Sequence, residues 1–418
     1  MSVDAQSTDK SPAAPWLSIV GLGADGVAGL SGAAQRAIAE APLVVGAARQ
    51  LALVHSLIGG ETLTWPSPLA GGIQKVLARR GKQTCVLASG DPFFYGIGAT
   101  LAPQLVCGEF VCHPSPSSLS LAAARLGWPL QETEVVSLHG RELHAVIRFL
   151  QPGRRLLALS WDRQTPSQLA ALLCARGFGG SRVHVLEALG GAQEKQRVCT
   201  ADAFDLSDLD DLNLVGLELE ASPDALVIPC RASLPDHTFE HDGQLTKQDV
   251  RAITLSALAP RAGALLWDVG AGAGSIAIEW MLSHPACCAI AIEQDPVRCQ
   301  RIRRNALQLG TPTLEIVQAR APLGLAALPR PDAVFIGGGA GDRALFERCW
   351  GALAPGGRLV INGVSLETEA LLLALRGEHG GELRQISIAS AVPLGTMTGW
   401  RPAMPVMQWR ISKPVSNP

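Results

Sequence analysis

The chain has 418 residues, of which 47% are hydrophobic and 17% charged, and its formal net charge at pH 7 is −2. This length is too great for a single hydrophobic core, so two or more domains are expected. The nearly balanced charge argues against a nucleic-acid partner, and no apolar run is long enough to span a membrane.

Four segments are predicted along the chain. Residues 1–14 are polar and small, without the apolar stretch of a signal peptide, and are expected to be a disordered tail. Residues 15–220 and 243–418 alternate short apolar runs with helical patterns, which is typical of α/β domains. Residues 221–242 contain three prolines and are predicted to link these domains. The ten cysteines form no C-x-x-C pair, so we expect reduced thiols in a cytoplasmic protein and no metal site.

The first domain opens with an apolar run at 16–20, which predicts a strand ending in the loop Gly21-Leu22-Gly23. A helix is expected from about Ser31, because small and apolar residues then recur on one face. Further strands are expected at 85–88, 155–160 and 182–186. The strand at 85–88 leads into Ser89-Gly90-Asp91-Pro92, a second glycine loop.

The second domain contains five apolar runs separated by helical patterns. Strands are predicted at 265–269, 289–293, 314–317, 333–336 and 358–362. A hairpin is expected to close the chain, with 383–390 pairing with 406–411. This order predicts a doubly wound, Rossmann-like sheet with an antiparallel edge.

A glycine-rich turn follows the first strand of the second domain. The run Asp268-Val269-Gly270-Ala271-Gly272-Ala273-Gly274 places a glycine at every second position, which lets a ligand lie against bare main chain. The next apolar run ends in Glu293, and an acid at the tip of the second strand is placed to hold a ribose diol. The pattern therefore predicts a site for an adenosine-containing cofactor.

The glycine spacing bears on which cofactor is bound. A dinucleotide fingerprint would have its third glycine at position 275, which is Ser275. The pattern instead resembles that of class I S-adenosylmethionine-dependent methyltransferases. Two alternatives stay open at this point: an oxidoreductase using a nicotinamide dinucleotide, and a tight turn with no ligand.

The first domain resembles the class III tetrapyrrole methyltransferases. The resemblance is carried by Val20-Gly21-Leu22-Gly23, by Ser89-Gly90-Asp91-Pro92 and by Pro114-Ser115-Pro116-Ser117-Ser118. It implies two α/β subdomains with S-adenosylmethionine folded in the cleft between them. The implied cofactor contacts are Gly21, Gly23, Gly90, Asp91, Ser117 and Ser118. The chain departs from the family's Gly-Pro-Gly-Asp-Pro loop, because it has Ala24, Asp25 and Gly26, with Val27 where the proline often lies.

The second domain resembles the decarboxylating corrin methyltransferases. The matching segments are 245–251, 267–274, Glu293, Asn305, Ala321-Pro322 and 331–339, the last ending in three glycines. The implied contacts with S-adenosylmethionine are Thr246, Gly270, Ala271, Gly272, Ala273, Gly274, Glu293 and Ala321.

The order of the two resemblances is that of a fused, two-domain methyltransferase of cobalamin biosynthesis. It implies methylation of the tetrapyrrole precorrin-6B at carbon 5 by the first domain and at carbon 15 by the second. The second domain would also remove carbon dioxide from the ring C acetate, giving precorrin-8x, and the protein would form a homo-oligomer. Another tetrapyrrole methyltransferase, or a tetrapyrrole carrier without chemistry, are the alternatives within this resemblance.

No catalytic residue is assigned, and five single residues keep two interpretations each. Asp91 and Thr246 are each either a helix N-cap or a cofactor contact. His139 is either catalytic or hydrogen-bonded to main chain at a strand end. Tyr95 either lines the cleft or packs against other rings. Arg251 either meets a substrate carboxylate or is solvated.

Overall fold

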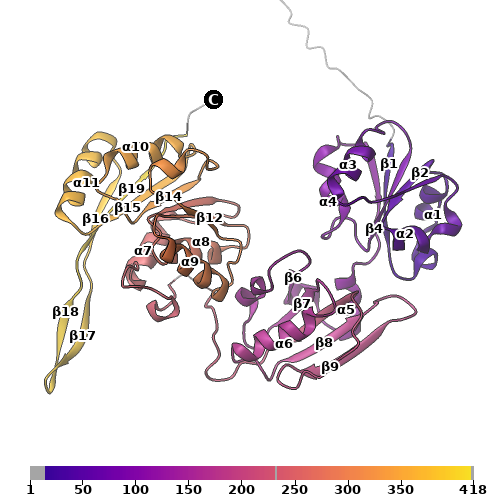
Figure 1. Ribbon diagram of the computed structural model, residues 1–418, viewed down its shortest axis with the longest axis horizontal. Helices are drawn as coiled ribbons and strands as arrows, with labels where there is room; N and C mark the ends of the chain where they lie inside the picture. The colour runs from indigo at the N-terminus through magenta and orange to yellow at the C-terminus, as the bar shows by residue number, and fades with distance from the viewer. Residues whose placement is uncertain (1–14, 231–232, 416–418) are drawn as a thin grey trace, which may run out of the picture. The chain divides into compact units, whose positions relative to one another are not determined.

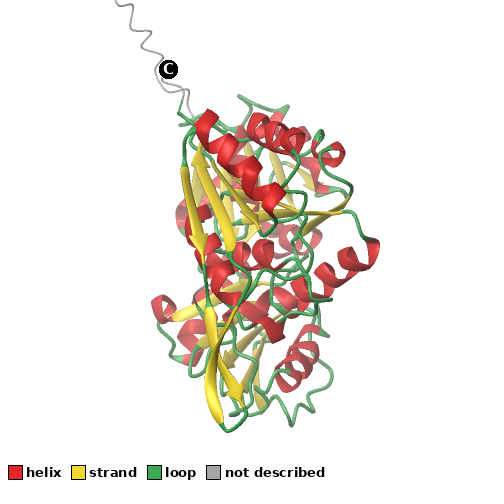
Figure 2. Cartoon of the chain, turned by 90° about the vertical axis from the view of Figure 1, so that its left-hand side faces the viewer, coloured by secondary structure: helices red, strands yellow, loops and turns green. Residues whose placement is uncertain are grey.

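The computed structural model describes residues 15–230 and 233–415; the tail predicted at 1–14 lies outside them. The chain divides into an N-terminal unit, Met1–Leu143 with Pro152–Leu226, and a C-terminal unit, His144–Gln151 with Val227–Pro418. Helices and strands alternate along both units, and Figure 2 shows the mixture of helices and strands in the chain, so the predicted α/β class is confirmed. None of the helices in the described ranges has the length and apolar content that a membrane crossing needs.

The first sheet of the N-terminal unit has five parallel strands in the order β3-β2-β4-β1-β5 (Figure 1). Its strands are β1 (Leu17–Leu22), β2 (Leu43–Gly46), β3 (Glu61–Thr64), β4 (Thr84–Ser89) and β5 (Phe110–His113). Its helices are α1 (Gly32–Ala39), α2 (Ala48–Leu53), α3 (Leu69–Leu77) and α4 (Ile97–Leu101). Ser31 caps α1 by accepting a hydrogen bond from the Ala34 amide.

The second sheet of this unit has the order β6-β7-β10-β8-β9. β6 and β7 are parallel, and the other pairs are antiparallel. The strands are β6 (Thr133–Ser137), β7 (Arg155–Leu159), β8 (Arg182–Glu187), β9 (Lys195–Thr200) and β10 (Asn213–Glu218), with helices α5 (Ser118–Leu126) and α6 (Thr165–Ala175). The two sheets agree with the two α/β subdomains that the resemblance implied.

The C-terminal unit contains a seven-stranded sheet in the order β13-β12-β11-β14-β15-β19-β16. Its strands are β11 (Leu265–Val269), β12 (Cys288–Glu293), β13 (Glu315–Gln318), β14 (Ala333–Ile336), β15 (Arg358–Gly363), β16 (Glu382–Ile386) and β19 (Val406–Ser412). Its helices are α7 (Gln248–Leu258), α8 (Ser275–Ser283), α9 (Pro296–Gln308), α10 (Arg343–Ala352) and α11 (Leu366–His379). The antiparallel strand β19 lies between β15 and β16, so it is second from the edge rather than at the edge.

The core of this sheet explains why its strands form. Trp267, Val334 and Ile361 are buried in one hydrophobic cluster with Phe346 of α10 and Trp409 of β19. Parallel strands that are covered on both faces need continuous apolar runs, and the runs at β11, β14 and β15 meet that need. The sheet therefore holds the loops at its carboxyl ends in fixed positions.

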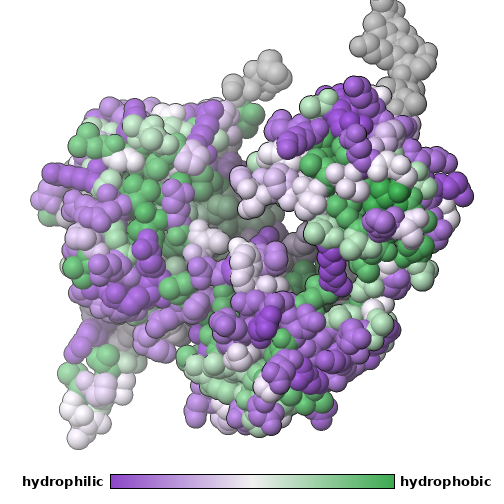
Figure 3. Space-filling model, turned by 45° about the vertical axis from the view of Figure 1, so that its right-hand side comes forward, coloured by the Kyte–Doolittle hydropathy of each residue, from purple (hydrophilic) through white to green (hydrophobic). Residues whose placement is uncertain are grey.

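A two-stranded ribbon, which the sequence did not predict, interrupts the closing hairpin. It consists of β17 (Ala389–Leu394) and β18 (Met397–Pro402), which pair only with each other. It extends from the seven-stranded sheet (Figure 1), and its tip shows little strongly hydrophilic surface (Figure 3). Trp400, for example, is 76% exposed.

Two segments belong to the C-terminal unit although they precede residue 243. The first segment is His144–Gln151. In it, Ile147 is buried against Gly310, where a Cβ would stand 3.2 Å from the Ile147 Cβ. Gln151 Nε2 donates to the Ile228 carbonyl at 2.7 Å. Within the predicted linker, the amide of Glu240 donates to Asn305 Oδ1 at 2.9 Å. This part of the linker is thus bound in place by the unit that follows it.

Candidate functional sites

A cavity of about 1370 Å³ opens at the carboxyl ends of β11, β12, β14 and β15. We call it the C-terminal cavity. The carboxyl ends of parallel strands form the usual ligand site of such sheets. The cavity is lined by the glycine loop after β11, by Glu293 after β12, by the glycines after β14, and by the 243–250 segment that leads into α7. Residues at the base of the β17–β18 ribbon, including Ile388 and Met404, also line it.

The turn after β11 needs glycine for two separate reasons. Gly270, Gly272 and Gly274 have φ values of +72°, +60° and +77°, a region that other residues rarely adopt. A Cβ at Gly270 would also stand 2.5 Å from the Cα of Gly338. The loops after β11 and β14 can therefore approach each other only because both carry glycine, and together they expose main chain to the cavity.

Glu293 is held in a fixed orientation at the tip of β12. Its Oε2 accepts the amide of Gly272 at 2.9 Å, and its Oε1 accepts the amides of Gln294 and Asp295 at 2.9 and 3.1 Å. The side chain is buried yet lines the cavity. Oε1 already accepts two hydrogen bonds, whereas Oε2 accepts one and has a lone pair left, so Glu293 can still accept a hydroxyl group of a ligand.

Six of the residues predicted to contact the cofactor in this domain line the cavity: Thr246, Gly270, Ala271, Gly272, Glu293 and Ala321. The other two, Ala273 and Gly274, do not line it. The Ala273 carbonyl accepts a hydrogen bond from Asn305 Nδ2 at 2.9 Å. Gly274 is the N-cap of α8, and a Cβ there would stand 2.8 Å from Ile302 Cγ2. Ala273 and Gly274 therefore belong to the motif because they shape and pack the turn between β11 and α8.

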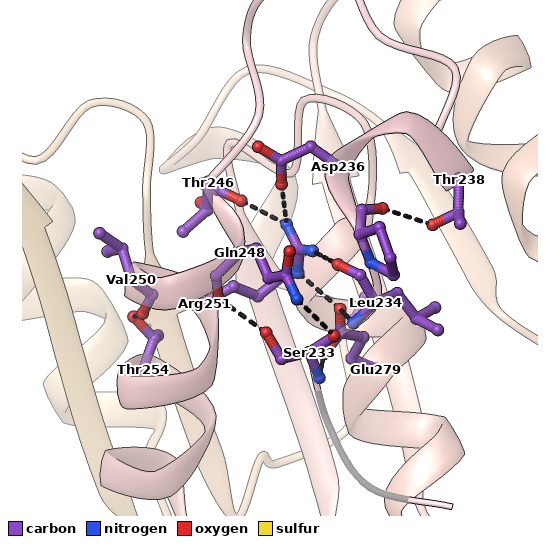
Figure 4. A network of polar contacts seen from close by, with 12 residues as sticks. Ser233, Leu234, Asp236, Thr238, Thr246, Gln248, Val250, Arg251, Thr254 and Glu279 are labelled. Atoms are coloured by element: carbon purple, nitrogen blue, oxygen red, sulfur yellow. Dashed lines mark hydrogen bonds and ion pairs between the residues drawn. The ribbon is translucent and has the colours of Figure 1, made fainter. Parts of the chain in front are cut away.

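Arg251 meets neither of the two expectations for it, because it is completely buried and paired within the protein (Figure 4). Its Nε donates to Glu279 Oε1 at 2.5 Å, and its Nη1 donates to Asp236 Oδ1 at 3.2 Å and to the Thr246 carbonyl at 2.5 Å. Nη2 donates to the Leu234 carbonyl. Arg251 therefore fixes the segments around 234–236 and 246 at the wall of the cavity.

Thr246 and Asp268 contribute to the cavity in different ways. Lys247, not Thr246, is the N-cap of α7, so the capping interpretation of Thr246 is wrong. Asp268 is buried, and its Oδ2 accepts the amide of Ala277 at 3.0 Å. Burial, together with the nearby charge of Glu293, raises the pKa of Asp268 to about 7.

The N-terminal unit contains a second cavity, of about 500 Å³, which we call the N-terminal cavity. It lies at the ends of β1 and β4 in one sheet and of β6 and β7 in the other. Four predicted cofactor contacts line it: Gly23, Gly90, Ser117 and Ser118. Gly90 has a φ of +59°, and Ser117 caps α5 by accepting the amide of Ser120 at 3.1 Å.

Gly21 and Asp91, the other two predicted contacts, do not line this cavity. A Cβ at Gly21 would collide with the Gly90 carbonyl and stand 2.6 Å from the Ser115 amide, so close packing of the loops explains this glycine. Asp91 Oδ1 accepts the amide of Phe93 at 2.8 Å, which is a local turn and not a helix cap.

Sequence reasoning missed Trp161 and Arg49, which also line the N-terminal cavity. Trp161 directly follows a predicted strand. Because ligand sites lie at the carboxyl ends of strands, this position could have identified Trp161 as a candidate site residue. Arg49 lies in α2, where the sequence gives no local sign of its position. Tyr95 and His139 do line the cavity. The Tyr95 ring also packs edge-to-face against Phe94, with the centroids 5.1 Å apart, so both interpretations of Tyr95 are confirmed.

Comparison with known proteins defines the class. A family described as "Precorrin methyltransferase domain" matches residues 237–413, and "Tetrapyrrole (Corrin/Porphyrin) Methylases" matches residues 17–205. With two glycine-lined cavities on α/β sheets, the chain is a methyltransferase built from two unlike domains. This excludes the oxidoreductase and the carrier without chemistry.

A curated protein of Sinorhizobium sp, precorrin-6Y C(5,15)-methyltransferase [decarboxylating], is 51% identical over 410 residues, which are 98% of this chain and 99% of that protein. The chain belongs to the family of these enzymes, as the resemblance predicted. Two Salmonella typhimurium proteins match shorter stretches. Cobalt-precorrin-6B C(15)-methyltransferase (decarboxylating) is 34% identical over 39% of this chain and 85% of its own length. Cobalt-precorrin-7 C(5)-methyltransferase is 33% identical over 44% of this chain and 88% of its own length.

Proposed function

We propose that this chain uses S-adenosylmethionine to methylate precorrin-6B twice, at carbon 15 in the C-terminal cavity and at carbon 5 in the N-terminal cavity. The C-terminal cavity would also release carbon dioxide from the ring C acetate, and the product would be precorrin-8x. The observation that carries the proposal is the presence of two separate glycine-lined cavities, one in each unit. The two Salmonella proteins support this division of labour, because each is named for one of the two positions.

The residues of the C-terminal cavity fit an adenosine cofactor. Glu293 presents a fixed carboxylate to a ribose diol, and the amides around Gly270–Gly272 lie on the same side of the cavity. Side chains at Gly270 or Gly272 would occupy the place where the two glycine loops and the Gln244 carbonyl meet. S-adenosylmethionine, when bound, supplies a methyl group on a sulfonium, which is already a strong electrophile.

The protein's part in methyl transfer is therefore alignment and exclusion of water. The glycines after β14, Gly337–Gly339, form a floor without side chains in the C-terminal cavity, where a large, flat substrate has room. Lys247 and Arg320 line the same cavity and are exposed cations that suit the carboxylates of a tetrapyrrole. In the N-terminal cavity, main-chain groups around Gly23 and Gly90 take the place of an acid on the ribose.

The proposal is tested with the full chain, because a cut at the predicted linker would remove His144–Gln151 from the C-terminal unit. Gly272→Val is expected to abolish the release of carbon dioxide from precorrin-6B, since a Cβ there stands 3.1 Å from the Gln244 carbonyl at a φ of +60°. Gly90→Val is the matching change in the N-terminal cavity, with a φ of +59° and a Cβ 3.0 Å from the Ser117 Cα. It should leave the release of carbon dioxide intact and abolish methylation at carbon 5.

Methylation is followed with S-adenosylmethionine labelled at the methyl group, and the methylated carbons are located by NMR. Gly263→Val and Gly81→Val are the controls, because these glycines also have positive φ but nothing within 4 Å of a Cβ. Release of carbon dioxide at the normal rate by Gly272→Val would contradict the assignment of decarboxylation to the C-terminal cavity.

A further inference from the structure

Exposed rings and one arginine gather at the mouth of the N-terminal cavity. They are Phe94, Tyr95, His139, Arg141 and Trp161, which we call the aromatic–arginine rim. Tyr95 and Trp161 are 52% and 55% exposed. Binding of the cofactor by glycine loops does not explain why these large rings are exposed to solvent. A cluster of exposed apolar side chains is typical of a binding site.

The rim is assembled from loops of both sheets in the N-terminal unit. Phe94 and Tyr95 follow β4, whereas His139 and Arg141 follow β6, and Trp161 follows β7. β6 and β7 are parallel, with Ser137 opposite Leu159, so their following loops emerge side by side. The rim therefore sits at the carboxyl ends of strands, on the same side as the glycine loop after β4.

The rings of the rim are ordered by contacts with one another. The ring centroids of His139 and Trp161 are 4.9 Å apart, and those of Phe94 and Tyr95 are 5.1 Å apart in an edge-to-face arrangement. Gly140, with a φ of +68°, lies beneath Trp161, where a Cβ would stand 3.1 Å from the ring atom Cζ3. The rim is thus preorganised, which reduces the entropy lost when a ligand binds.

Tyr95 has an unusual backbone conformation. Its φ is +56°, which is rare for a residue with a bulky side chain. Residues held in this way are concentrated at ligand sites, where the strain serves to aim a side chain. In this case it places the Tyr95 ring at the cavity, beside the guanidinium of Arg141, whose Cζ lies 5.7 Å from the ring centroid.

The uncompensated charge of the cavity is positive. Arg49 and Arg141 line it, and neither has a carboxylate within ion-pair distance in residues 15–230 and 233–415. The lining carboxylate, Asp211, is already bound by Arg163 through two hydrogen bonds of 2.7 and 2.6 Å. Arg141 is therefore free to bind an anion, and a guanidinium matches a carboxylate through two parallel hydrogen bonds.

Flat apolar rings and an unpaired guanidinium together select a flat, conjugated anion. We propose that the aromatic–arginine rim binds the edge of the tetrapyrrole, with Tyr95 and Trp161 against the face of the macrocycle and Arg141 paired with one of its carboxylates. This inference rests on the proposed function of the N-terminal cavity. The three side chains bind the substrate for the methyl transfer to carbon 5 and orient it at the mouth of the cavity.

The test measures methylation of carbon 5 by the full chain as the concentration of precorrin-6B is varied. Arg141→Gln and Trp161→Leu should each raise the KM for this methylation about tenfold, as expected for the loss of one charge-assisted pair or one large contact, with kcat changed less than about twofold. Release of carbon dioxide by the C-terminal cavity is the internal control and should not change. Arg141→Lys should recover only part of the lost affinity, because it keeps the charge but loses the paired hydrogen bonds of the guanidinium. Trp161→Phe should recover most of it, because it keeps a ring.

Phe93→Leu and Arg182→Gln are the matched controls. Phe93 belongs to the same loop and is exposed, but it stacks on Phe110 and does not line the cavity. Arg182 is an exposed cation of the same unit away from the cavity. An unchanged KM in Arg141→Gln and Trp161→Leu, or a KM raised equally by the two controls, would overturn the proposal.

A second measurement separates this inference from the proposed function. Equilibrium binding of uroporphyrin III, a flat tetrapyrrole that carries eight carboxylates, needs no methyl transfer. Because the C-terminal cavity is a second site for a tetrapyrrole, the titration is fitted with two sites. The affinity of one site should weaken about tenfold in Arg141→Gln, and both affinities should stay unchanged in Phe93→Leu. If the unmodified chain binds uroporphyrin III through Arg141 but never methylates carbon 5, the proposed function is wrong. The proposal that the aromatic–arginine rim binds a tetrapyrrole would then still hold. Equal binding by both variants refutes the rim itself.

Discussion

Arg251 Nε and Glu279 Oε1 are 2.5 Å apart, and both side chains are almost completely removed from water, with exposed fractions of 0% and 1%. Glu279 also accepts the amides of Ser233 and Leu234, at 2.7 and 3.0 Å. The pair therefore ties helices α7 and α8 to the segment that enters the C-terminal unit. It supports the cavity from behind and does not face a ligand.

Loss of one partner of this pair should strongly destabilise the C-terminal unit. Glu279→Gln leaves a buried guanidinium with a weaker partner, and the expected loss in the free energy of unfolding is about 3 kcal/mol. Urea denaturation of the full chain, followed by tryptophan fluorescence, measures it. Arg304→Gln, which breaks an exposed pair with Glu240, is the control and should have little effect on this free energy. Equal losses in the two variants would show that burial adds nothing to this pair.

The contact between the two glycine loops predicts a difference between Gly270→Ala and Gly263→Ala. Both glycines have positive φ, +72° and +81°, so both substitutions carry the strain of about 1 kcal/mol that this conformation imposes on alanine. Only the Cβ at Gly270 collides with backbone, at Gly338. Of the two cofactor sites seen in calorimetric titration, the one in the C-terminal cavity should therefore also bind S-adenosylhomocysteine at least about tenfold more weakly in Gly270→Ala. Comparable affinity in both variants would mean that the close approach of the loops is unimportant for binding.

The raised pKa of Asp268 predicts a pH dependence of stability. Between its ordinary value of about 4 and its folded value of about 7, the native chain keeps a proton that the unfolded chain has released. The contribution of Asp268 to the free energy of unfolding therefore falls as pH rises across this window. Asp268→Asn keeps an acceptor for the Ala277 amide and removes the titration. Urea denaturation at pH 5 and pH 7.5 should show a smaller decrease for the variant, and parallel decreases would argue against a raised pKa.

The packing of His144–Gln151 predicts a remote effect of Ile147→Ala. Ile147 is buried, and its Cβ lies 3.2 Å from the position of a Cβ at Gly310. Arg148 Nη2 donates to the Leu282 carbonyl at 3.2 Å. The truncation should cost about 2–4 kcal/mol and speed amide hydrogen exchange in peptides around Leu282 and Gly310. Val106→Ala, at an exposed position, should leave that exchange unchanged. Unchanged protection in the Ile147 variant would show that the segment is not part of this core.

The sequence alone predicted those features of the site that depend on residues close together in the chain. Gly270 and Gly272 are required by a turn of a few residues, and Glu293 is placed by the end of the next strand, so spacing alone located them. Arg251 was misjudged because its partner Glu279 lies 28 residues away and its other partners include main-chain carbonyls. A side chain that binds carbonyl groups leaves no pattern in the sequence.

Two features of the sheet could not be predicted for a similar reason. The insertion of β19 between β15 and β16 depends on pairing between segments far apart in the chain. The ribbon β17–β18 has no core of its own, so hydrophobic periodicity gives little sign of it. The exposed rings of the aromatic–arginine rim have the same composition as a packed cluster, and only the fold shows that they border a cavity.

The association of His144–Gln151 with the C-terminal unit bears on how this protein can be recombined. A chimera that takes its N-terminal half from a relative, joined at the predicted linker, would import eight foreign residues into the core around Gly310. Two crossover points are needed in addition to the linker, one on each side of this segment, so that it stays with the residues it packs against. In evolution, the same requirement would make substitutions at Ile147 and Gly310 depend on each other, although 163 positions separate them (310 − 147).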